Sequence, residues 1–203
     1  MSEEVKPLFK NDILNGLSWK APYMLDLFRV FSATRGPDLP LKSAKYFKEA
    51  FTWRVRAALF KEFEDTEWAI KVWASLEHGF INLFAETYLY HKLEPYADGY
   101  FHYLNHLISA FKSLASLSLD KSQKKFYLAL AEVCVELSDY VRTYHPKRLF
   151  NAISLALKYN LTDIEKLTEA LYSYSSEVAE AFISKWKEYM GTEFPNKIQK
   201  GEK

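Results

Sequence analysis

Apolar residues recur at steps of three or four positions along most of this chain, which is the spacing of amphipathic helices. The clearest run is preceded by Thr162 and Glu165, which have the spacing of a helix-capping box, and is followed by Gly191, a frequent helix terminator. We expect one long helix here. Its apolar positions are Ile164, Leu167, Leu171, Tyr174, Val178, Phe182 and Tyr189.

A second capping box, Asp120 with Gln123, opens a run that we expect to continue to about His145, where Pro146 stops it. Shorter periodic segments and the Gly and Pro residues between them predict the remaining helices. No convincing alternation of period two occurs outside these segments. The sequence therefore predicts an all-α fold, a single helical bundle of about seven helices with short loops. The other expected helices cover 22–33, 42 to about 60, 66–94, 96–116 and 146–159.

The length of 203 residues argues for one domain, which we place at residues 1–190, with a polar and flexible tail at 191–203. The longest apolar run, Phe126–Ala131, is far shorter than a membrane span, and the acidic N-terminus does not resemble a secretory signal. We therefore expect a cytoplasmic protein without membrane contact. Scarce Gln, with abundant Lys, Glu and Tyr, leans toward a thermophilic source.

The charge balance limits the kinds of partner. Lys and Arg number 27 and Asp and Glu number 26, so the surface as a whole is not built for phosphate binding, although a local patch remains open. The single cysteine, Cys134, excludes an intramolecular disulfide and a cysteine-based zinc site. We expect it to be buried and inert. No glycine-rich phosphate loop or nucleophile elbow occurs, so we predict no catalytic residue and no cofactor.

Two basic segments are candidate nucleic-acid contacts. In KSAKYFKEAFTWRVR, residues 42–56, a helix places four of the five cations on one narrow arc, with Arg54 near the apolar side. This arc is either a solvated face or a phosphate-contacting ridge with Tyr46 or Trp53 available for stacking. RTYHPKR, residues 142–148, is either a cationic helix end or an anion site. The nucleic-acid candidates are Lys45, Lys48, Arg56, Arg142, Lys147 and Arg148.

Histidines suggest a possible metal site. His102 and His106 share one helix face, and the turn at 94–99 would bring His91 beside His102 and Glu86 beside His106. The candidate metal ligands are therefore His91, His102, His106 and Glu86. Against this, Glu86 and His91 project about 140° apart on a helix, and the Glu-x-x-His motif of di-iron bundles is absent. Partly exposed, hydrogen-bonded histidines are the alternative.

Tyrosines concentrate between residues 88 and 103, in YLYHKLEPYADGYFHY. Tyrosine combines apolar area with a polar tip and is enriched at interfaces, so this segment could form a homodimer or a protein-partner surface. Packing within the chain and a small-molecule pocket are the alternatives. The interface candidates are Tyr88, Tyr90, Tyr96, Tyr100 and Tyr103.

The function these patterns favour is a non-enzymatic helical interaction module that self-associates or binds a protein, with RNA or DNA or a larger complex as a further partner. A structural subunit of a larger complex is a third hypothesis. The alternative is a helical-bundle enzyme that uses the His/Glu metal site or an aromatic pocket for a small molecule. Metal content separates the two hypotheses.

Overall fold

The computed structural model describes residues 42–60, 66–89, 97–117, 121–159, 161–162 and 164–192, without the side chains of 52–60, 66–71, 97–98, 117 and 174. These residues form seven helices and no strand, which confirms the all-α prediction. The helices are α4 (Lys42–Phe60), α5 (Thr66–Leu89), α6 (Ala97–Leu117), α7 (Lys121–Thr143), α8 (Pro146–Lys158), α9 (Ile164–Tyr174) and α10 (Ser176–Met190).

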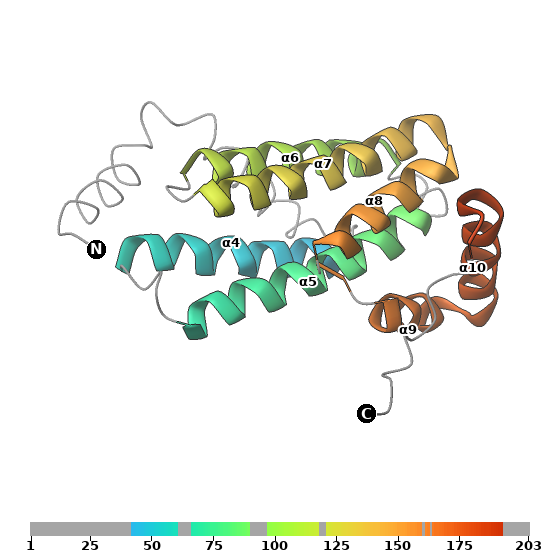
Figure 1. The fold of residues 1–203 in the computed structure, drawn as a ribbon, viewed down its shortest axis with the longest axis horizontal. Coiled ribbons are helices and arrows are strands. Elements are labelled where there is room, and N and C mark those ends of the chain that lie inside the picture. Colours follow the sequence, from blue (N-terminus) through green and yellow to red (C-terminus); the bar gives the residue numbers. More distant parts are fainter. Residues whose placement is uncertain are drawn as a thin grey trace.

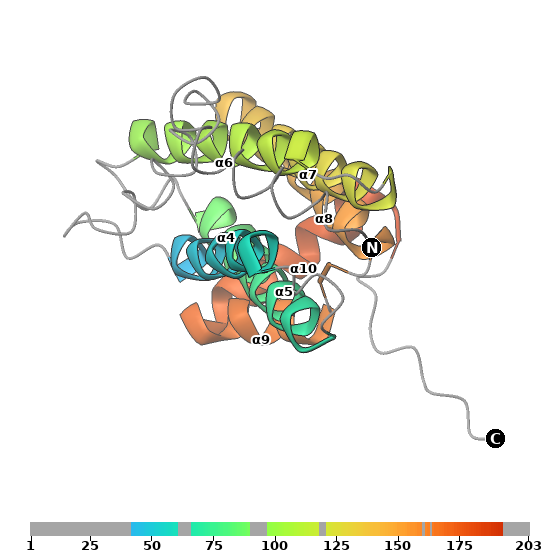
Figure 2. The same cartoon turned by 90° about the vertical axis from the view of Figure 1, so that its left-hand side faces the viewer.

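The first four described helices form two layers, α4 with α5 and α6 with α7 (Figures 1 and 2). Each layer is an antiparallel helix pair. After Pro146, α8 turns back across α7 toward α5, while α9 packs on α5 and α10 packs on α8 and α9. The expected helix at 22–33 lies outside the described residues.

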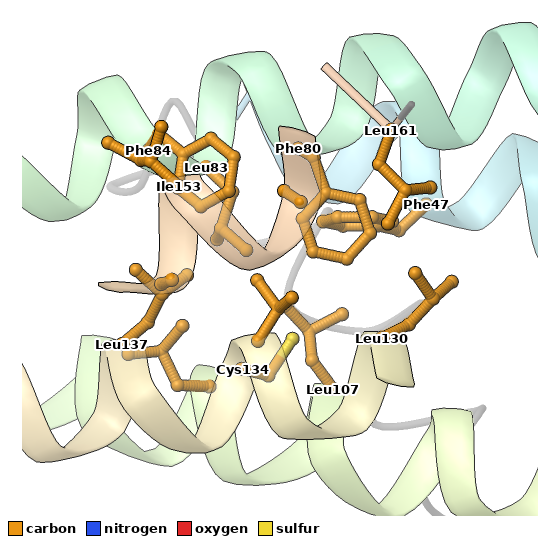
Figure 3. Packing of buried hydrophobic residues seen from close by; sticks show 14 of the residues in the cluster. Phe47, Phe80, Leu83, Phe84, Leu107, Leu130, Cys134, Leu137, Ile153 and Leu161 are labelled. Carbon is orange, nitrogen blue, oxygen red and sulfur yellow. The ribbon is translucent and has the colours of Figure 1, made fainter. Parts of the chain in front are cut away.

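An aromatic cluster of four phenylalanines, Phe47, Phe51, Phe80 and Phe111, fills the space between the layers. The Phe47 ring packs edge-on against Phe80 and Phe111, with ring centroids 5.1 Å and 5.7 Å away, and all four rings are fully buried. Figure 3 shows Phe47 and Phe80 facing Leu107, Leu130 and Cys134 of the other layer. This apolar burial is the main force that holds the layers together.

One expected helix boundary was wrong, and another is shifted by two residues. The predicted single last helix is two helices, because Ser175 leaves the helical conformation and its hydroxyl accepts a hydrogen bond from Val178 N at 3.0 Å. The Thr162 hydroxyl does not make the hydrogen bond expected of a capping box, since its Oγ1 has no hydrogen-bond partner among the described residues. Upstream, α7 ends at Thr143 rather than His145, with Tyr144 in the left-handed conformation at φ 56°.

The last described helix, α10, ends at Met190 in a glycine cap. Gly191 adopts φ 67° and donates its N–H to Lys187 O at 3.1 Å, which is a glycine C-cap. Most of the expected tail, residues 193–203, lies outside the described part of the chain. Among the described helices, none is at once long and apolar enough to span a bilayer.

Candidate functional site: a buried carboxyl between three helices

The most unusual group inside the described structure is the carboxyl of Glu86, near the end of α5, of which only 4% is exposed. It lies in a polar cluster of five buried residues drawn from α4, α5 and α6. Buried carboxyls are rare in proteins unless they are paired or hydrogen-bonded. The members of this polar cluster are Ser43, Glu86, Thr87, Tyr100 and Tyr103.

Glu86 caps the start of α4 from a neighbouring helix. Its Oε1 accepts the backbone N–H of Ser43 at 3.1 Å, and its Oε2 accepts the Ser43 hydroxyl at 2.5 Å. The backbone N–H of Lys42 also bonds to this carboxyl. The first N–H groups of a helix have no partner within the helix, and α4 has no acidic residue in its first turn. A carboxylate from α5 therefore supplies the acceptor that the sequence of α4 lacks.

A chain of hydroxyl groups extends this contact to α6. The Tyr103 hydroxyl lies 2.9 Å from Ser43 Oγ. A serine hydroxyl has one hydrogen to donate. When Glu86 is ionised that hydrogen goes to the carboxylate, so Tyr103 must donate to Ser43. When Glu86 is protonated it can itself donate to Ser43 Oγ, and the chain can run in the opposite direction, toward Tyr103.

A second pair of hydroxyl groups lies beside the first. Thr87 Oγ1 is 2.7 Å from the Tyr100 hydroxyl, which also donates to the Leu83 carbonyl oxygen at 3.3 Å. Because Tyr100 uses its hydrogen on Leu83, Thr87 donates to Tyr100. All five members of the polar cluster are therefore hydrogen-bonded inside the protein, and the cluster ties α4 and α5 to α6.

Burial controls the acidity of this cluster. Loss of hydration raises the pKa of Glu86 from 4.5 to about 7, and the hydrogen bonds from Ser43 and Lys42 only partly oppose it. The same burial raises the pKa values of Tyr100 and Tyr103 well above 10, and it raises the pKa of the Cys134 thiol. Glu86 thus exchanges a proton near neutral pH while these three neighbours stay protonated, which is the one chemical capacity that this cluster adds to its packing.

The predicted metal ligands are dispersed in the described structure. Glu86 is turned to Ser43, His102 is exposed on α6, and His106 is half-buried one turn later. His91 lies outside the described residues. Within the described part of the chain no three His, Cys, Asp or Glu side chains gather in a way that could hold a metal ion. A site that includes His91 stays a prediction.

The described interface candidates lie in the core of the single chain. Tyr100 and Tyr103 belong to the polar cluster, and Tyr88 packs edge-on against Phe182 of α10, with ring centroids 5.2 Å apart. Packing within the chain, one of the alternatives left open by the sequence, accounts for these three residues. Tyr90 and Tyr96 lie outside the described residues.

The predicted nucleic-acid contacts occupy two separate places. On α4, Lys45 is exposed and Lys48 is half-buried, while the Arg56 side chain is not among those described. At the junction of α7 and α8, Arg142 pairs with Asp139 at 2.6 Å and Arg148 pairs with Glu136 at 3.2 Å, whereas Lys147 is exposed. Carboxylates therefore neutralise two of the three cations at this junction.

The structure brings an exposed tryptophan to the lysine-rich start of α7, which we had not predicted. Trp73 of α5 is 39% exposed and stacks on Phe126 of α7, with ring centroids 5.5 Å apart and planes inclined by 19°. Lys121, Lys124 and Lys125, all exposed, lie in the two helical turns that lead to Phe126. The sequence KSQKKF showed the lysines, but only the ring contact between Trp73 of α5 and Phe126 of α7 adds the tryptophan. We call these five residues the Trp73 surface.

No protein-family model, curated protein or solved structure matches this chain. The case for a function therefore rests on the residues described above.

Proposed function

We propose that this protein is a non-enzymatic helical module that binds single-stranded nucleic acid through the Trp73 surface. The observation that carries the proposal is an exposed tryptophan, stacked on Phe126 near the start of α7, the same helix end that carries three exposed lysines. Proteins that bind single strands without strong sequence preference combine cations for the phosphates with aromatic rings on which bases stack.

The placement of the lysines is unfavourable for the isolated helix. They lie in the first turns of α7, where the helix dipole disfavours positive charge, and α7 has no acidic residue in its first turn. Lys121 is also three and four positions from Lys124 and Lys125, where like charges repel. A bound phosphate would relieve both effects, because it supplies negative charge to the lysines and to the start of the helix.

The tryptophan favours a single strand over a duplex. Its ring is supported on one side by Phe126, and 39% of the residue remains exposed. An unpaired base can stack on such a ring, whereas the bases of a duplex are already stacked and face away from the protein. Each base stacked on an aromatic side chain is typically worth about 1–3 kcal/mol.

The proposal is tested by the binding of labelled single-stranded RNA and DNA oligonucleotides, followed by fluorescence anisotropy at several salt concentrations. We expect binding that weakens with salt, and loss of binding in the triple variant Lys121→Glu/Lys124→Glu/Lys125→Glu. The matched control is Lys147→Glu/Lys158→Glu/Lys185→Glu, which changes the net charge equally at exposed lysines elsewhere.

The control also separates two locations. If the control variant loses binding and the Lys121 variant keeps it, the assignment to the Trp73 surface is wrong, and the binding surface includes at least one of Lys147, Lys158 and Lys185. If the wild-type protein binds neither RNA nor DNA at low salt, the proposed function is wrong.

A further inference from the structure

The start of α4 and the end of α5 are joined by one carboxyl group. Glu86 accepts the first free N–H groups of α4 and the Ser43 hydroxyl, and Ser43 in turn contacts Tyr103 of α6. These bonds link residues 43 and 60 positions apart in sequence, so they exist only while the helices are packed together.

We propose that Glu86 is a proton-operated clasp, which holds the start of α4 against α5 and α6 most tightly when its carboxyl is protonated and loosens as the carboxyl ionises. This is a regulatory device within the fold, and it is independent of nucleic-acid binding. Its physical basis is that a neutral carboxyl can remain buried and still hydrogen-bond Ser43, whereas a carboxylate gains hydration when the clasp opens.

Of the four buried groups Glu86, Tyr100, Tyr103 and Cys134, Glu86 is the one whose pKa lies near neutral pH. On α4 the charged neighbour is Lys42, and on α6 and α7 the titratable neighbours are Tyr100, Tyr103 and Cys134, whose pKa values are all raised. Those three stay neutral at and below pH 7. His106, half-buried one turn beyond Tyr103, is a further ionisable side chain on α6. It therefore needs its own control.

The direction and the size of the pH dependence of opening follow from the difference in the pKa of Glu86 between the closed and the open state. In the open state Glu86 is hydrated and ionises near its ordinary value of 4.5, while in the closed state burial holds its proton to about pH 7. Between these limits the open state binds fewer protons, so each unit of rising pH favours opening about tenfold. The total effect is on the order of 10²-fold, and it levels off above pH 7.

Cys134 offers a built-in reporter of opening. It is the only cysteine of the chain, is fully buried, and interacts electrostatically with both Tyr100 and Tyr103. Its rate of reaction with 2,2′-dithiodipyridine is measured from pH 4.5 to 8 in the wild-type protein and in Glu86→Gln, under conditions where reclosing is faster than labelling. The ratio of the two rates cancels the intrinsic pH dependence of the thiol.

We expect this ratio of wild-type to variant rate to rise about 10²-fold between pH 4.5 and 7 and then to stay constant. Glu132→Gln, at an exposed glutamate of α7, should behave as the wild type does, and so should His106→Gln. A ratio that does not change with pH overturns the proposal, as does a pH dependence that disappears in His106→Gln.

A second measurement uses only the wild-type protein, so it does not require the Glu86→Gln variant to fold. The ¹³C chemical shift of the Glu86 side-chain carboxyl is followed during a pH titration of the wild-type protein. A midpoint near 7 supports the clasp, and a midpoint near 4.5 overturns it, because the folded and open states would then bind protons equally.

Discussion

The aromatic cluster and the polar cluster occupy neighbouring turns of the same helices, yet they hold those helices together by different means. On α4, Phe47 follows Ser43 by one turn, and on α5, Phe80 precedes Glu86 by less than two turns. The aromatic cluster gains stability simply from burial. The polar cluster must compensate the lost hydration of a carboxyl, and its contribution therefore depends on pH.

The two clusters therefore contribute differently to the fold: one to its free energy of folding, the other to the position of α4. Apolar rings could pack in several registers, whereas the carboxyl of Glu86 bonds only when the first turn of α4 is beside it. The polar cluster thus fixes the position of α4, and the aromatic cluster supplies most of the free energy. Buried polar groups specify a unique arrangement in some proteins, and here that role is a hypothesis that the following predictions test.

The largest effect is expected in the aromatic cluster. Phe111 of α6 contacts the rings of Phe47, Phe51 and Phe80, with centroids 5.5–5.7 Å away. Phe111→Ala leaves a cavity between the layers and should lower the free energy of unfolding by about 3–5 kcal/mol at any pH. Chemical denaturation at pH 5 and pH 8 measures this. A loss that differs strongly between the two pH values would mean that the two clusters are not independent.

The next effect is the pH dependence of the wild-type protein. The pKa of Glu86 is raised from 4.5 to about 7 in the folded state, so between these pH values the unfolded chain binds fewer protons than the folded one. Stability is therefore greatest in acid and falls as pH rises, by up to about 3 kcal/mol in total. Acid unfolding by other carboxyl groups opposes this trend, so the measurement is the difference in unfolding free energy between wild type and Glu86→Gln. A difference that is constant from pH 4.5 to 7 contradicts the assignment.

A smaller effect is expected at Ser43, because the substitution removes one hydroxyl and no charge. Ser43→Ala takes away the side-chain bond to Glu86 and the contact with Tyr103, and should cost about 1–3 kcal/mol. Because the Ser43 hydrogen bond lowers the pKa of Glu86, its loss should raise that pKa further. The ¹³C titration of the Glu86 carboxyl measures this shift, and a downward shift would show that Ser43 favours the protonated form.

The sequence predicted the parts of the molecule that depend on local pattern. Apolar periodicity indicated α4 to α8, and the turn before α6 indicated its antiparallel return along α5, which the packing of Phe80 on Phe111 and of Thr87 on Tyr100 bears out. The break at Ser175 was missed because the apolar period continues across it, from Leu171 to Val178, so that only the cap reveals it.

The sites were harder to predict because they are made by contacts between distant residues. Glu86 was considered as a metal ligand on account of its neighbours along α5 and α6, but its partner is Ser43, which no spacing rule connects to it. In the same way, the lysines of KSQKKF gave no indication that Trp73 lies over Phe126. Periodicity gives the face of a helix, whereas the partner across the interface depends on how the layers meet.

The smallest effect, and the sharpest test of close packing, is at Gly79 of α5. A Cβ atom there would lie 2.7 Å from the Phe47 ring, which Phe80 and Phe111 hold in place. The strain of such overpacking destabilises a protein by about 1–3 kcal/mol, and the higher helix propensity of alanine offsets up to about 1 kcal/mol of this loss. Gly79→Ala should therefore destabilise the protein by about 1 kcal/mol, as measured by denaturation. If the clash with Phe47 is the cause, then Gly79→Ala should become neutral or stabilising in a Phe47→Leu background, where the ring is absent. An equal loss in both backgrounds would show that a contact other than the clash with the Phe47 ring causes the destabilisation.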